Sequence, residues 1–434
     1  MTSNHSLKTK LKRILPNWLV HPLLNPFHWL ESLIARIIYG FPAHSMNFIG
    51  VTGTNGKSTT VNLIASILET SGRKTAIYST AIIKIGSESG DNIIGNGLTT
   101  SNPFVLHKTL RQMKKAGAQW VVLEVSSHAL VQHRVAGIKF EGVLITNLTR
   151  DHLDYHGTMD NYAKAKGKLF ANKPTYMSLN HDDEWFDFFD HYPAEHKISY
   201  GTHAYAEAKI AGAKLSFKGT ALRIKLDNHQ LDVDLKLPGQ FNAYNATAAA
   251  SLTYVMGIEL NHIKKGLEAF QHMPGRMELI VEGQKFKVII DHAHTPDALE
   301  QLFQNVRMLL KGRLVTVIGC DGDRDSGKRE PIGKLAAEYS ELMIVTDQEP
   351  NTEDPAAIRA EILKGARKVK EGVIIKEIAD RRKAIHEAFK YVNRGDVVLI
   401  PGLGNQHYRG MADGKVEWDD REVARAELKK LKKP

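Results

Sequence analysis

The chain has 434 residues, which is enough for two or three domains with hydrophobic cores of ordinary size. Hydrophobic residues make up 42% of it and charged residues 24%, as in a typical soluble globular protein. The net charge of +10, from 58 basic and 48 acidic residues, suits an anionic partner such as a nucleotide, a nucleic acid or an anionic membrane surface. Because the sequence has no aromatic–basic RNA-binding signature, we expect no nucleic acid partner.

The single cysteine, Cys320, excludes an internal disulfide and fits the reducing cytoplasm. No group of cysteines and histidines has the spacing of a zinc site. We therefore expect a cytoplasmic protein.

The first 46 residues form an arm of unusual composition. Four basic residues precede two apolar stretches: Lys8, Lys10, Lys12 and Arg13 come before 18–30 and 33–39. Three prolines and two charged residues interrupt any span of about 20 apolar residues, and no apolar core leads to a cleavage site, which argues against a transmembrane helix and a signal peptide. Two interpretations stay open: a short helical arm packed on the main domain, and peripheral contact of residues 1–46 with a membrane.

The most informative segment is 47–60, Asn-Phe-Ile-Gly-Val-Thr-Gly-Thr-Asn-Gly-Lys-Ser-Thr-Thr. An apolar run leads into a glycine-rich turn, then Lys57 and Ser58, then the apolar spacing of a helix. In such a unit the backbone N–H groups cradle nucleotide phosphates, the lysine reaches the outer phosphates and the serine hydroxyl can ligate Mg²⁺. The strict pattern has glycine where this chain has Val51. The strand before the loop and the helix after it nevertheless predict ATP or GTP binding.

After residue 46, apolar strand-like runs alternate with helical stretches, which predicts an α/β fold with a mostly parallel sheet. The first series of strands is expected at 47–52, 75–79, 120–125 and 142–146. Residues 175–236 suggest an antiparallel insertion or flank, and 242–256 a helix. A second, Rossmann-like series is expected at 286–290, 313–319, 342–346, 373–378 and 397–400. The predicted parts are the arm (1–46), a P-loop central ATP-binding domain (47–272) and a C-terminal α/β domain (273–434).

Two strands of the first series end in residues suited to chemistry. Glu124 lies near the carboxyl end of 120–125, where open α/β sheets bind ligands. A carboxylate there can hold Mg²⁺ against phosphates bound at Lys57, unless the N-terminus of a neighbouring helix satisfies it. The next strand leads into 146–157, where Asp, His, Asp and His crowd together. This crowding indicates a second cation site or a site that positions charged substrate.

Six segments, in the same order along the chain, resemble the Mur ligase family. They are Thr-Gly-Thr-Asn-Gly-Lys-Ser-Thr at 52–59 and the segments 124–134, 146–157, 275–277, 291–297 and 322–329. Within the family the chain is most similar to the UDP-N-acetylmuramoyl-tripeptide synthetases, which add the third residue of the peptidoglycan stem peptide. The resemblance covers residues 47–425.

This resemblance implies an ATP-dependent ligase that joins an amino acid to a carboxylate of a muramyl-dipeptide-type acceptor. In the family the acceptor carboxylate attacks the γ-phosphate of ATP to give an acyl phosphate, and the amine then displaces phosphate. Both steps bring anions together, so Lys57, Mg²⁺ and Arg276 should act by electrostatic stabilisation and positioning. Closure of the C-terminal domain would assemble the site.

The resemblance also assigns individual residues. The ATP phosphates would be held by Gly53, Thr54, Asn55, Gly56, Lys57, Ser58 and Thr59. Further nucleotide contacts would come from Asn245, Arg276 and Asp291, with His294 where the C-terminal domain closes over the substrates. The metal positions are Ser58, Glu124, His152 and Lys166, and catalysis would depend on Lys57, His152, Lys166 and Arg276. The acceptor would be gripped by Thr99, Thr100, Ser126, Gln132 and Arg134.

Lys166 matches the lysine that the family carbamylates with CO₂, which turns a cation into an anion that can organise magnesium and the γ-phosphate. Without the resemblance, Lys166 would be taken for a solvated helix lysine like Lys164. Asn245 could likewise be a helix cap, and Arg276 a surface residue of a linker.

Three departures from the family pattern bear on the substrates. The relatives carry an N-terminal domain that binds the UDP end of the acceptor, and residues 1–46 are too few for it. Either UDP is gripped weakly by the remaining domains, or the acceptor is not a UDP nucleotide. A lipid-linked acceptor would fit the apolar, basic arm.

The other two departures concern the incoming amino acid. Gln-Glu-Pro-Asn at 348–351 stands where members that add meso-diaminopimelate have Asp-Asn-Pro-Arg, whose arginine binds the distal carboxylate. Asn351 has no charge, and Glu349 could face a distal ammonium, which favours L-lysine or L-ornithine; Glu349 could also be a surface turn residue. Gly-Leu-Gly-Asn-Gln-His-Tyr at 402–408 also lacks an acid of the family pattern, whereas Arg324 remains to hold the α-carboxylate.

Two alternative functions stay open. One keeps the chemistry but uses a lipid-linked muropeptide or a polyglutamate as acceptor, as in folylpolyglutamate synthetase, cyanophycin synthetase or the Mur-like partner of a glutamine amidotransferase. The other is a nucleotide-binding scaffold that has lost catalysis, which the intact candidate residues argue against.

Overall fold

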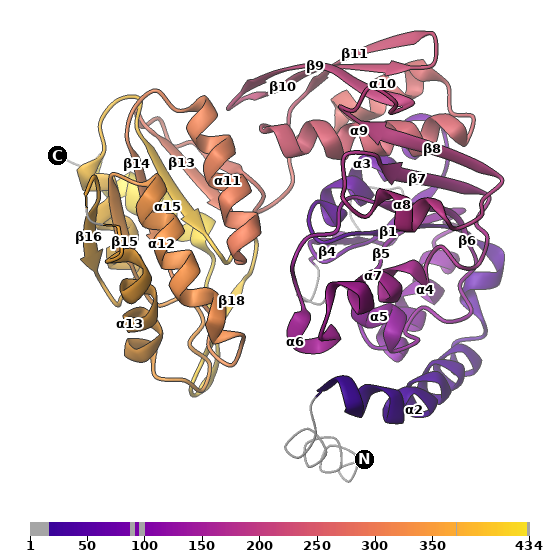
Figure 1. Cartoon of the computed structure of the whole chain (residues 1–434), viewed down its shortest axis with the longest axis horizontal. Helices are drawn as coiled ribbons and strands as arrows, with labels where there is room; N and C mark the ends of the chain where they lie inside the picture. Colours follow the sequence, from indigo (N-terminus) through magenta and orange to yellow (C-terminus); the bar gives the residue numbers. More distant parts are fainter. Residues whose placement is uncertain (1–16, 87–91, 95–99, 370, 432–434) are drawn as a thin grey trace. The chain divides into compact units, whose positions relative to one another are not determined.

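Figure 1 shows the chain as a computed structural model, which describes residues 17–86, 92–94, 100–369 and 371–431. The chain divides into two compact units. Unit 1 comprises 1–214, 220–236 and 241–270, and unit 2 comprises 215–219, 237–240 and 271–434. The predicted α/β fold class is confirmed, because both large sheets consist mainly of parallel strands. The domain limits at 46 and 272 stay predictions.

The sheet of unit 1 has eleven strands among the described residues, in the order β11-β10-β9-β8-β7-β6-β1-β5-β2-β3-β4. Its strands are β1 (Asn47–Thr52), β2 (Thr75–Tyr78), β3 (Ile82–Lys84), β4 (Asn92–Ile94), β5 (Trp120–Glu124), β6 (Phe140–Ile145), β7 (Tyr176–Asn180), β8 (His196–Gly201), β9 (Ala208–Ser216), β10 (Gly219–Leu226) and β11 (His229–Leu235). The central strand β1 pairs in parallel with β5 on one side and β6 on the other. The carboxyl ends of these three strands therefore meet at one edge, as the candidate site requires.

Helices pack on both faces of this sheet. They are α3 (Lys57–Thr70), α4 (Pro103–Lys115), α5 (Ser127–Val131), α6 (Leu153–His156), α7 (Met159–Gly167), α8 (Phe186–Asp190), α9 (Gln240–Val255) and α10 (Leu260–Ala269). Side chains of β1 alternate between the faces: Phe48 joins a buried cluster with Leu106 and Leu110 of α4, whereas Ile49 and Leu252 of α9 lie against Gly142. The helix expected at 242–256 is confirmed as α9.

Strands β7, β8 and β9 correct the expectation of an antiparallel flank at 175–236. β7 pairs in parallel with β6 and with β8, and β8 pairs in parallel with β9, so the parallel sheet continues. The short helix α8 lies between β7 and β8 and supplies the crossover that parallel neighbours need. The antiparallel pairing expected in this region is present in the hairpin of β10 and β11.

From residue 17 on, the arm before β1 is helical, as predicted. Helix α2 (Asn17–Ile38) packs against α4 and α6, and a 3₁₀ helix, η1 (Pro42–Ser45), packs against α4 before the chain enters β1 (Figure 1). In the described parts of the chain, no helix is both long and apolar enough to cross a bilayer.

Unit 2 is built on a six-stranded sheet in the order β12-β13-β17-β14-β15-β16, with a separate hairpin of β18 and β19. The strands are β12 (Glu278–Ile280), β13 (Lys287–Asp291), β14 (Leu314–Ile318), β15 (Leu342–Val345), β16 (Ile374–Glu377), β17 (Val397–Pro401), β18 (Tyr408–Met411) and β19 (Gly414–Glu417). The helices are α11 (Pro296–Leu309), α12 (Arg329–Tyr339), α13 (Pro355–Ala366), α14 (Arg381–Tyr391) and α15 (Asp420–Leu431), with a 3₁₀ turn η2 (Ser326–Lys328). The five strands of the predicted second series are all present, and β12 adds an antiparallel edge.

Candidate active site

The loop between β1 and α3 has a backbone that only glycine accommodates at two positions. Gly53 has φ +144°, and a Cβ there would overlap the hydroxyl of Thr146. Gly56 has φ +82°, caps α3, and faces the carboxamide of Asn245. The Lys57 ammonium donates to the carbonyls of Gly53 (3.1 Å) and Thr54 (2.7 Å). The loop thus brings its backbone and a cation together at the N-terminus of α3, which is the geometry of a phosphate cradle.

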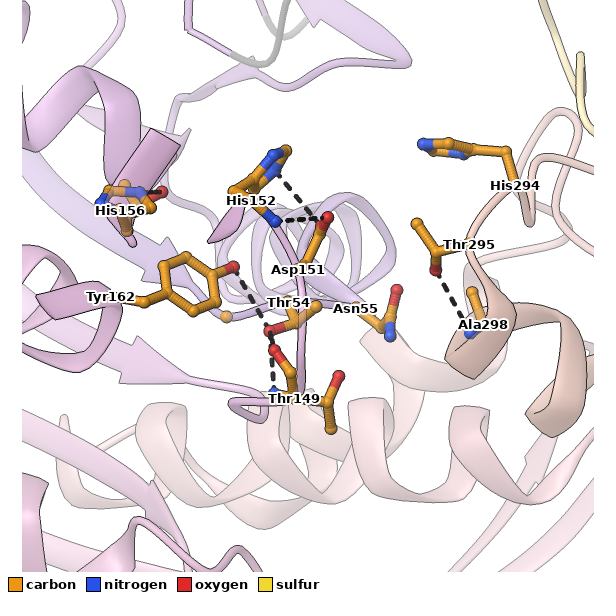
Figure 2. Close-up of polar contacts among 12 residues, drawn as sticks. Thr54, Asn55, Thr149, Asp151, His152, His156, Tyr162, His294, Thr295 and Ala298 are labelled. Atoms are coloured by element: carbon orange, nitrogen blue, oxygen red, sulfur yellow. Dashed lines mark hydrogen bonds and ion pairs between the residues drawn. The ribbon is translucent and has the colours of Figure 1, made fainter. Parts of the chain in front are cut away.

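Residues just after β6 hold this loop in place. Asn147 Oδ1 accepts a hydrogen bond from the Asn55 N–H (2.9 Å), and the Thr146 hydroxyl donates to the Asn55 carbonyl (2.6 Å). Figure 2 shows the Thr54 hydroxyl next to Thr149, which donates its N–H to it over 3.0 Å. The sequence predicted a site within 146–157 but assigned no individual role to Thr146, Asn147 or Thr149. Their position after a strand next to β1 is the signal that could have found them.

Ser58 and Glu124 come together as the metal assignment requires. The Ser58 hydroxyl donates to Glu124 Oε2 over 2.6 Å, and the same oxygen accepts the Thr80 N–H over 2.9 Å. Glu124 is buried. Within the described residues, no group of three or more His, Cys, Asp or Glu could hold a metal ion by itself. One hydroxyl and one carboxylate fit Mg²⁺, which proteins commonly bind through one or two carboxylates together with substrate phosphates.

Lys166 is not a solvated helix lysine; it is 1% exposed. Its ammonium donates to the Gly53 carbonyl over 2.6 Å and lies 4.5 Å from the centre of the Tyr162 ring. Burial, and after it the charge of Lys57, holds the pKa of Lys166 well below its ordinary value. The Tyr162 hydroxyl lies 3.4 Å from that of Thr54 (Figure 2), and burial raises the pKa of Tyr162. Lys166 is therefore part of the phosphate loop's surroundings.

His152 lies at the start of α6 with a left-handed backbone, φ +54°. Its Nε2 lies 3.3 Å from a carboxylate oxygen of Asp151, and about half of the side chain is exposed (Figure 2). Its ring centre lies 4.8 Å from that of His128 and 6.2 Å from that of Tyr162. The two histidines of 146–157, His152 and His156, thus each pack on His128 and on Tyr162, in an aromatic group beside the phosphate loop.

The predicted acceptor residues form one hydrogen-bonded group in unit 1, which we call the acceptor cluster: Thr100, Ser126, Gln132 and Arg134. Arg134 donates to the Thr100 carbonyl and, through Nε and Nη2, to Gln132 Oε1 (3.0 and 2.6 Å). The Thr100 hydroxyl donates to the backbone carbonyl of Glu124 (3.0 Å) and accepts the Ser126 N–H (3.3 Å). Burial lowers the pKa of Arg134. Thr99 lies outside the described residues.

Tyr155 extends the acceptor cluster and was missed from the sequence. Its hydroxyl accepts a hydrogen bond from Gln132 Nε2 over 3.0 Å, and its ring lies 4.0 Å from that of His128. The Ser126 hydroxyl, by contrast, accepts the Ala129 N–H and so caps α5. The donors of Arg134 form a planar fork, the geometry that binds a carboxylate best.

Asn245 lies in the second turn of α9, so it is not a helix cap. It is buried, its Oδ1 faces Gly56 and accepts from the Thr60 hydroxyl (3.4 Å), and its Nδ2 donates to Asn242 (3.1 Å). Asn245, on α9, therefore contacts the phosphate loop at Gly56.

In unit 2, Arg276 lies near Asp291. The Asp291 carboxylate is buried and accepts the N–H groups of Met277 and Ala293, each over 2.7 Å. Burial raises the pKa of Asp291, and Arg276 opposes that rise. His294 Nδ1 lies 2.8 Å from the His292 carbonyl. His294 stands two residues before α11, whose first turn is capped by Thr295 (Figure 2).

The three residues assigned to the incoming amino acid are also brought together in unit 2. Asn351 Nδ2 donates to the Gly322 carbonyl (3.0 Å), and the Glu349 carboxylate accepts the Gly410 N–H (2.9 Å). Burial raises the pKa of Glu349, and Arg324 is among the charges that lower it. Glu349 is thus partly buried rather than a surface turn residue, and Arg324 is exposed nearby.

The comparisons with known proteins identify the family. Residues 51–253 match the Mur ligase middle domain, and residues 275–404 match the Mur ligase glutamate ligase domain. The chain is 39% identical over 407 residues to the UDP-N-acetylmuramoyl-L-alanyl-D-glutamate--2,6-diaminopimelate ligase of Geobacillus kaustophilus, covering 92% of this chain and 82% of that one. It is 40% identical over 401 residues to the ligase of the same name from Syntrophomonas wolfei, with 92% and 81% covered.

Comparison with solved structures also finds ligases of this kind. A ligase of that same name superposes with a TM-score of 0.64 at 29% identity, covering 94% of this chain and 82% of that one. The folylpolyglutamate synthase of Mycobacterium tuberculosis reaches 0.69 over 89% and 95% of the two chains, but at 18% identity it shares only the fold.

The protein is therefore an ATP- and Mg²⁺-dependent ligase that forms carbon–nitrogen bonds between an acid and an amino acid. It belongs to the Mur ligase family. The names of its relatives specify 2,6-diaminopimelate, which runs against our preference for L-lysine or L-ornithine.

Proposed function

We propose that this ligase acts in peptidoglycan biosynthesis in the cytoplasm and adds a diamino acid to the D-glutamate carboxylate of UDP-N-acetylmuramoyl-L-alanyl-D-glutamate. One observation carries the proposal: Glu124 links the two halves of the site. Its carboxylate contacts Ser58 of the phosphate loop, and its backbone carbonyl accepts from Thr100 of the acceptor cluster. A phosphate site and a carboxylate-binding arginine at the same edge of a sheet suit a reaction between ATP and a carboxylate. The names of the relatives supply the acceptor.

The reaction would begin with attack of the acceptor carboxylate on the γ-phosphate of ATP, which forms an acyl phosphate and releases ADP. The amine of the diamino acid would then attack the acyl carbon, and inorganic phosphate would leave. Arg134 would orient the acceptor, while Lys57 and, from unit 2, Arg276 would offset the charge of the phosphates. Mg²⁺, held at Ser58 and Glu124, would neutralise phosphate charge.

We further propose that Lys166 is carbamylated. Only a neutral amine reacts with CO₂, and burial together with Lys57 lowers the pKa of Lys166 and favours that form. The carbamate would carry a negative charge beside the loop carbonyl of Gly53, where Lys57 and magnesium could balance it.

The choice of diamino acid depends on two opposing observations. The relatives' names favour 2,6-diaminopimelate. Asn351 offers no cation for a distal carboxylate, and the nearby Glu349 suits a distal ammonium, as L-lysine and L-ornithine have. Contact of residues 1–46 with a membrane is a separate proposal, because it involves none of these residues.

A ligation assay read by mass spectrometry tests the function. The purified protein is incubated with Mg-ATP, bicarbonate, UDP-N-acetylmuramoyl-L-alanyl-D-glutamate and equal amounts of meso-diaminopimelate, L-lysine and L-ornithine. We expect a UDP-tripeptide whose mass names the amino acid. If a folded, ATP-binding protein gives no product, the proposed acceptor is wrong, and a lipid-linked muropeptide is the next one to supply.

A further inference from the structure

Helix α2 presents its apolar side to solvent. Five large aliphatic and aromatic side chains, each between 40% and 64% exposed, lie within about a third of the helix circumference at 100° per residue: Phe27, Leu30, Ile34, Ile37 and Ile38. We call this set the apolar stripe. An ordinary surface helix turns such a stripe toward the core and its polar residues toward water. The orientation of α2 is the reverse.

The opposite side of α2 is small or polar, and it is fixed to unit 1. His28, Ser32 and Ala35 are buried where α2 packs on α4 and α6. The Arg36 guanidinium packs against Gly137 and lies 5.7 Å from the centre of the Phe41 ring. This packing uses the polar side of the helix. Rotating α2 to hide the apolar stripe would expose His28 and Ser32 and break the contact of Arg36 with Gly137. The stripe is therefore held outward by the fold.

The charges near α2 favour one kind of partner for the stripe. Residues 1–16 contain four basic side chains and no acidic one, and α2 itself contains only Glu31 and Arg36 as charged residues. A helix with bulky apolar residues on one side, next to a basic segment, is the pattern of a helix that lies in the interface of an anionic membrane. No described helix could cross a bilayer, so contact along the surface is the mode that remains open to α2.

We propose that α2 docks unit 1 on the surface of an anionic lipid bilayer, with the apolar stripe in the interface. The positive charge of the sequence before α2 favours anionic lipid as the partner. This goes beyond the proposed function and holds for any acceptor. It has a consequence for the active site, because α2 packs on α6. Helix α6 carries Tyr155, whose hydroxyl accepts a hydrogen bond from Gln132 of the acceptor cluster, so α2 lies near that cluster. Docking would hold the acceptor end of the site close to the membrane surface.

Sedimentation with vesicles tests the proposal. The full chain is mixed with vesicles of phosphatidylglycerol and phosphatidylcholine, or of phosphatidylcholine alone. We expect binding to the anionic vesicles, falling as salt is added because the headgroup charge is screened. The variant Leu30→Gln/Ile34→Gln/Ile37→Gln should lose at least 10-fold in binding, on the order of what three apolar side chains contribute. Replacing the four basic residues by Gln should weaken binding by roughly fivefold for each residue that reaches the surface.

The matched control is Val281→Gln/Met308→Gln/Val416→Gln, which removes three other exposed apolar side chains in unit 2. It should bind vesicles like the unaltered protein. A second measurement leaves the apolar stripe unaltered and follows tryptophan fluorescence. Trp29 is 51% exposed on α2, so brominated lipid should quench its fluorescence. The variant Trp29→Phe gives the fluorescence of the other four tryptophans as the reference.

Three outcomes would overturn the proposal. The first is no binding of the unaltered chain to anionic vesicles. The second is unchanged binding of the triple α2 variant. The third is a dimer in solution that the triple α2 variant disrupts while vesicles bind neither protein, which would assign the stripe to a second copy of the chain. Ligation activity without vesicles should be unchanged in the triple variant, so failure of docking and failure of the proposed function are separate results.

Discussion

At the scale of single residues, Lys166 shows how the fold changes the chemistry of a side chain. It occupies a helix between two exposed lysines, Lys164 and Lys168, yet it is almost fully buried and donates to the phosphate loop. Within the described residues this buried ammonium donates to the Gly53 carbonyl, and the lowered pKa of Lys166 reflects the cost of burying its charge. Conversion to a carbamate would replace this cation by an anion that magnesium can pair.

Replacing Lys166 by alanine should reduce the rate of ligation by about 100-fold or more, as the loss of a charged group at a phosphoryl-transfer site does. A small carboxylic acid such as formate should restore part of the rate, because it can occupy the space of the carbamate. The rate is measured with and without added acid. Lys164→Ala, on the exposed side of the same helix, is the control and should be fully active. Full activity of the Lys166 variant, or a carbamate-free lysine by mass spectrometry and ¹³CO₂ NMR, would contradict the assignment.

A second residue-scale prediction concerns Asn351. Introducing Asn351→Arg places a cation beside Glu349 and Arg324, where the distal carboxylate of meso-diaminopimelate would bind. The ratio of kcat/KM for meso-diaminopimelate over L-lysine should rise by about 10-fold or more, the size of one charge-assisted hydrogen bond. Asn351→Met has similar length without charge and controls for the left-handed backbone at this position, φ +50°. An equal ratio in both variants would mean that position 351 does not contact the distal group.

At the scale of elements, α12 and α13 pack so closely that each needs glycine at the crossing. A Cβ on Gly333 would overlap the Ile362 carbonyl, and a Cβ on Gly365 would overlap the Glu330 carbonyl. These overlaps are with backbone atoms, which cannot move aside as a flexible side chain would. The two helices are therefore fixed against each other in unit 2, which also contains the residues assigned to the incoming amino acid.

Gly333→Ala should lower the free energy of unfolding of unit 2 by about 1–3 kcal/mol, because overpacking outweighs the gain in helix propensity. Denaturant titration followed by circular dichroism measures the change. Gly212→Ala is the matched control, since Gly212 is exposed in β9 and a Cβ there meets open space. If Gly333→Ala were as stable as the control, the two helices would be able to accommodate the added Cβ without loss of free energy of unfolding.

At the scale of the whole molecule, the candidate site residues are divided between the units. Lys57, Glu124 and the acceptor cluster belong to unit 1, whereas Arg276, Asp291 and Arg324 belong to unit 2. If all of them serve one reaction, the units have to come together around the substrates, as closing enzymes do.

A non-hydrolysable ATP analogue with Mg²⁺ and the acceptor should therefore reduce the radius of gyration, measured by small-angle X-ray scattering. The variant Lys57→Ala should bind the nucleotide weakly and show no contraction at the same concentrations, because the nucleotide is the group that both units would hold. Contraction that is equal in the variant would mean that closure does not depend on the phosphate loop.

Much of the fold and part of the site could be predicted from the sequence, because those features are local. Strands β1, β5 and β13 are buried on both faces of a parallel sheet, so each appears in the sequence as a continuous apolar run that can be recognised as a strand. The glycine-rich loop carries its own backbone requirements, and the order of the motifs identifies the family. The parallel pairing of β7 to β9 was not predictable in this way, because pairing depends on the crossover between strands rather than on either strand.

Tertiary structure alone decided the rest. The burial of Lys166, the Thr80 and Thr146 contacts, and the link from Glu124 to Thr100 join residues that lie 24 to 113 positions apart. The apolar composition of α2 is visible in the sequence, but which side of the helix faces water is set by its packing on α4 and α6. Local patterns determine which elements form and what chemistry they offer; long-range packing determines which charges are buried and which surfaces are left exposed.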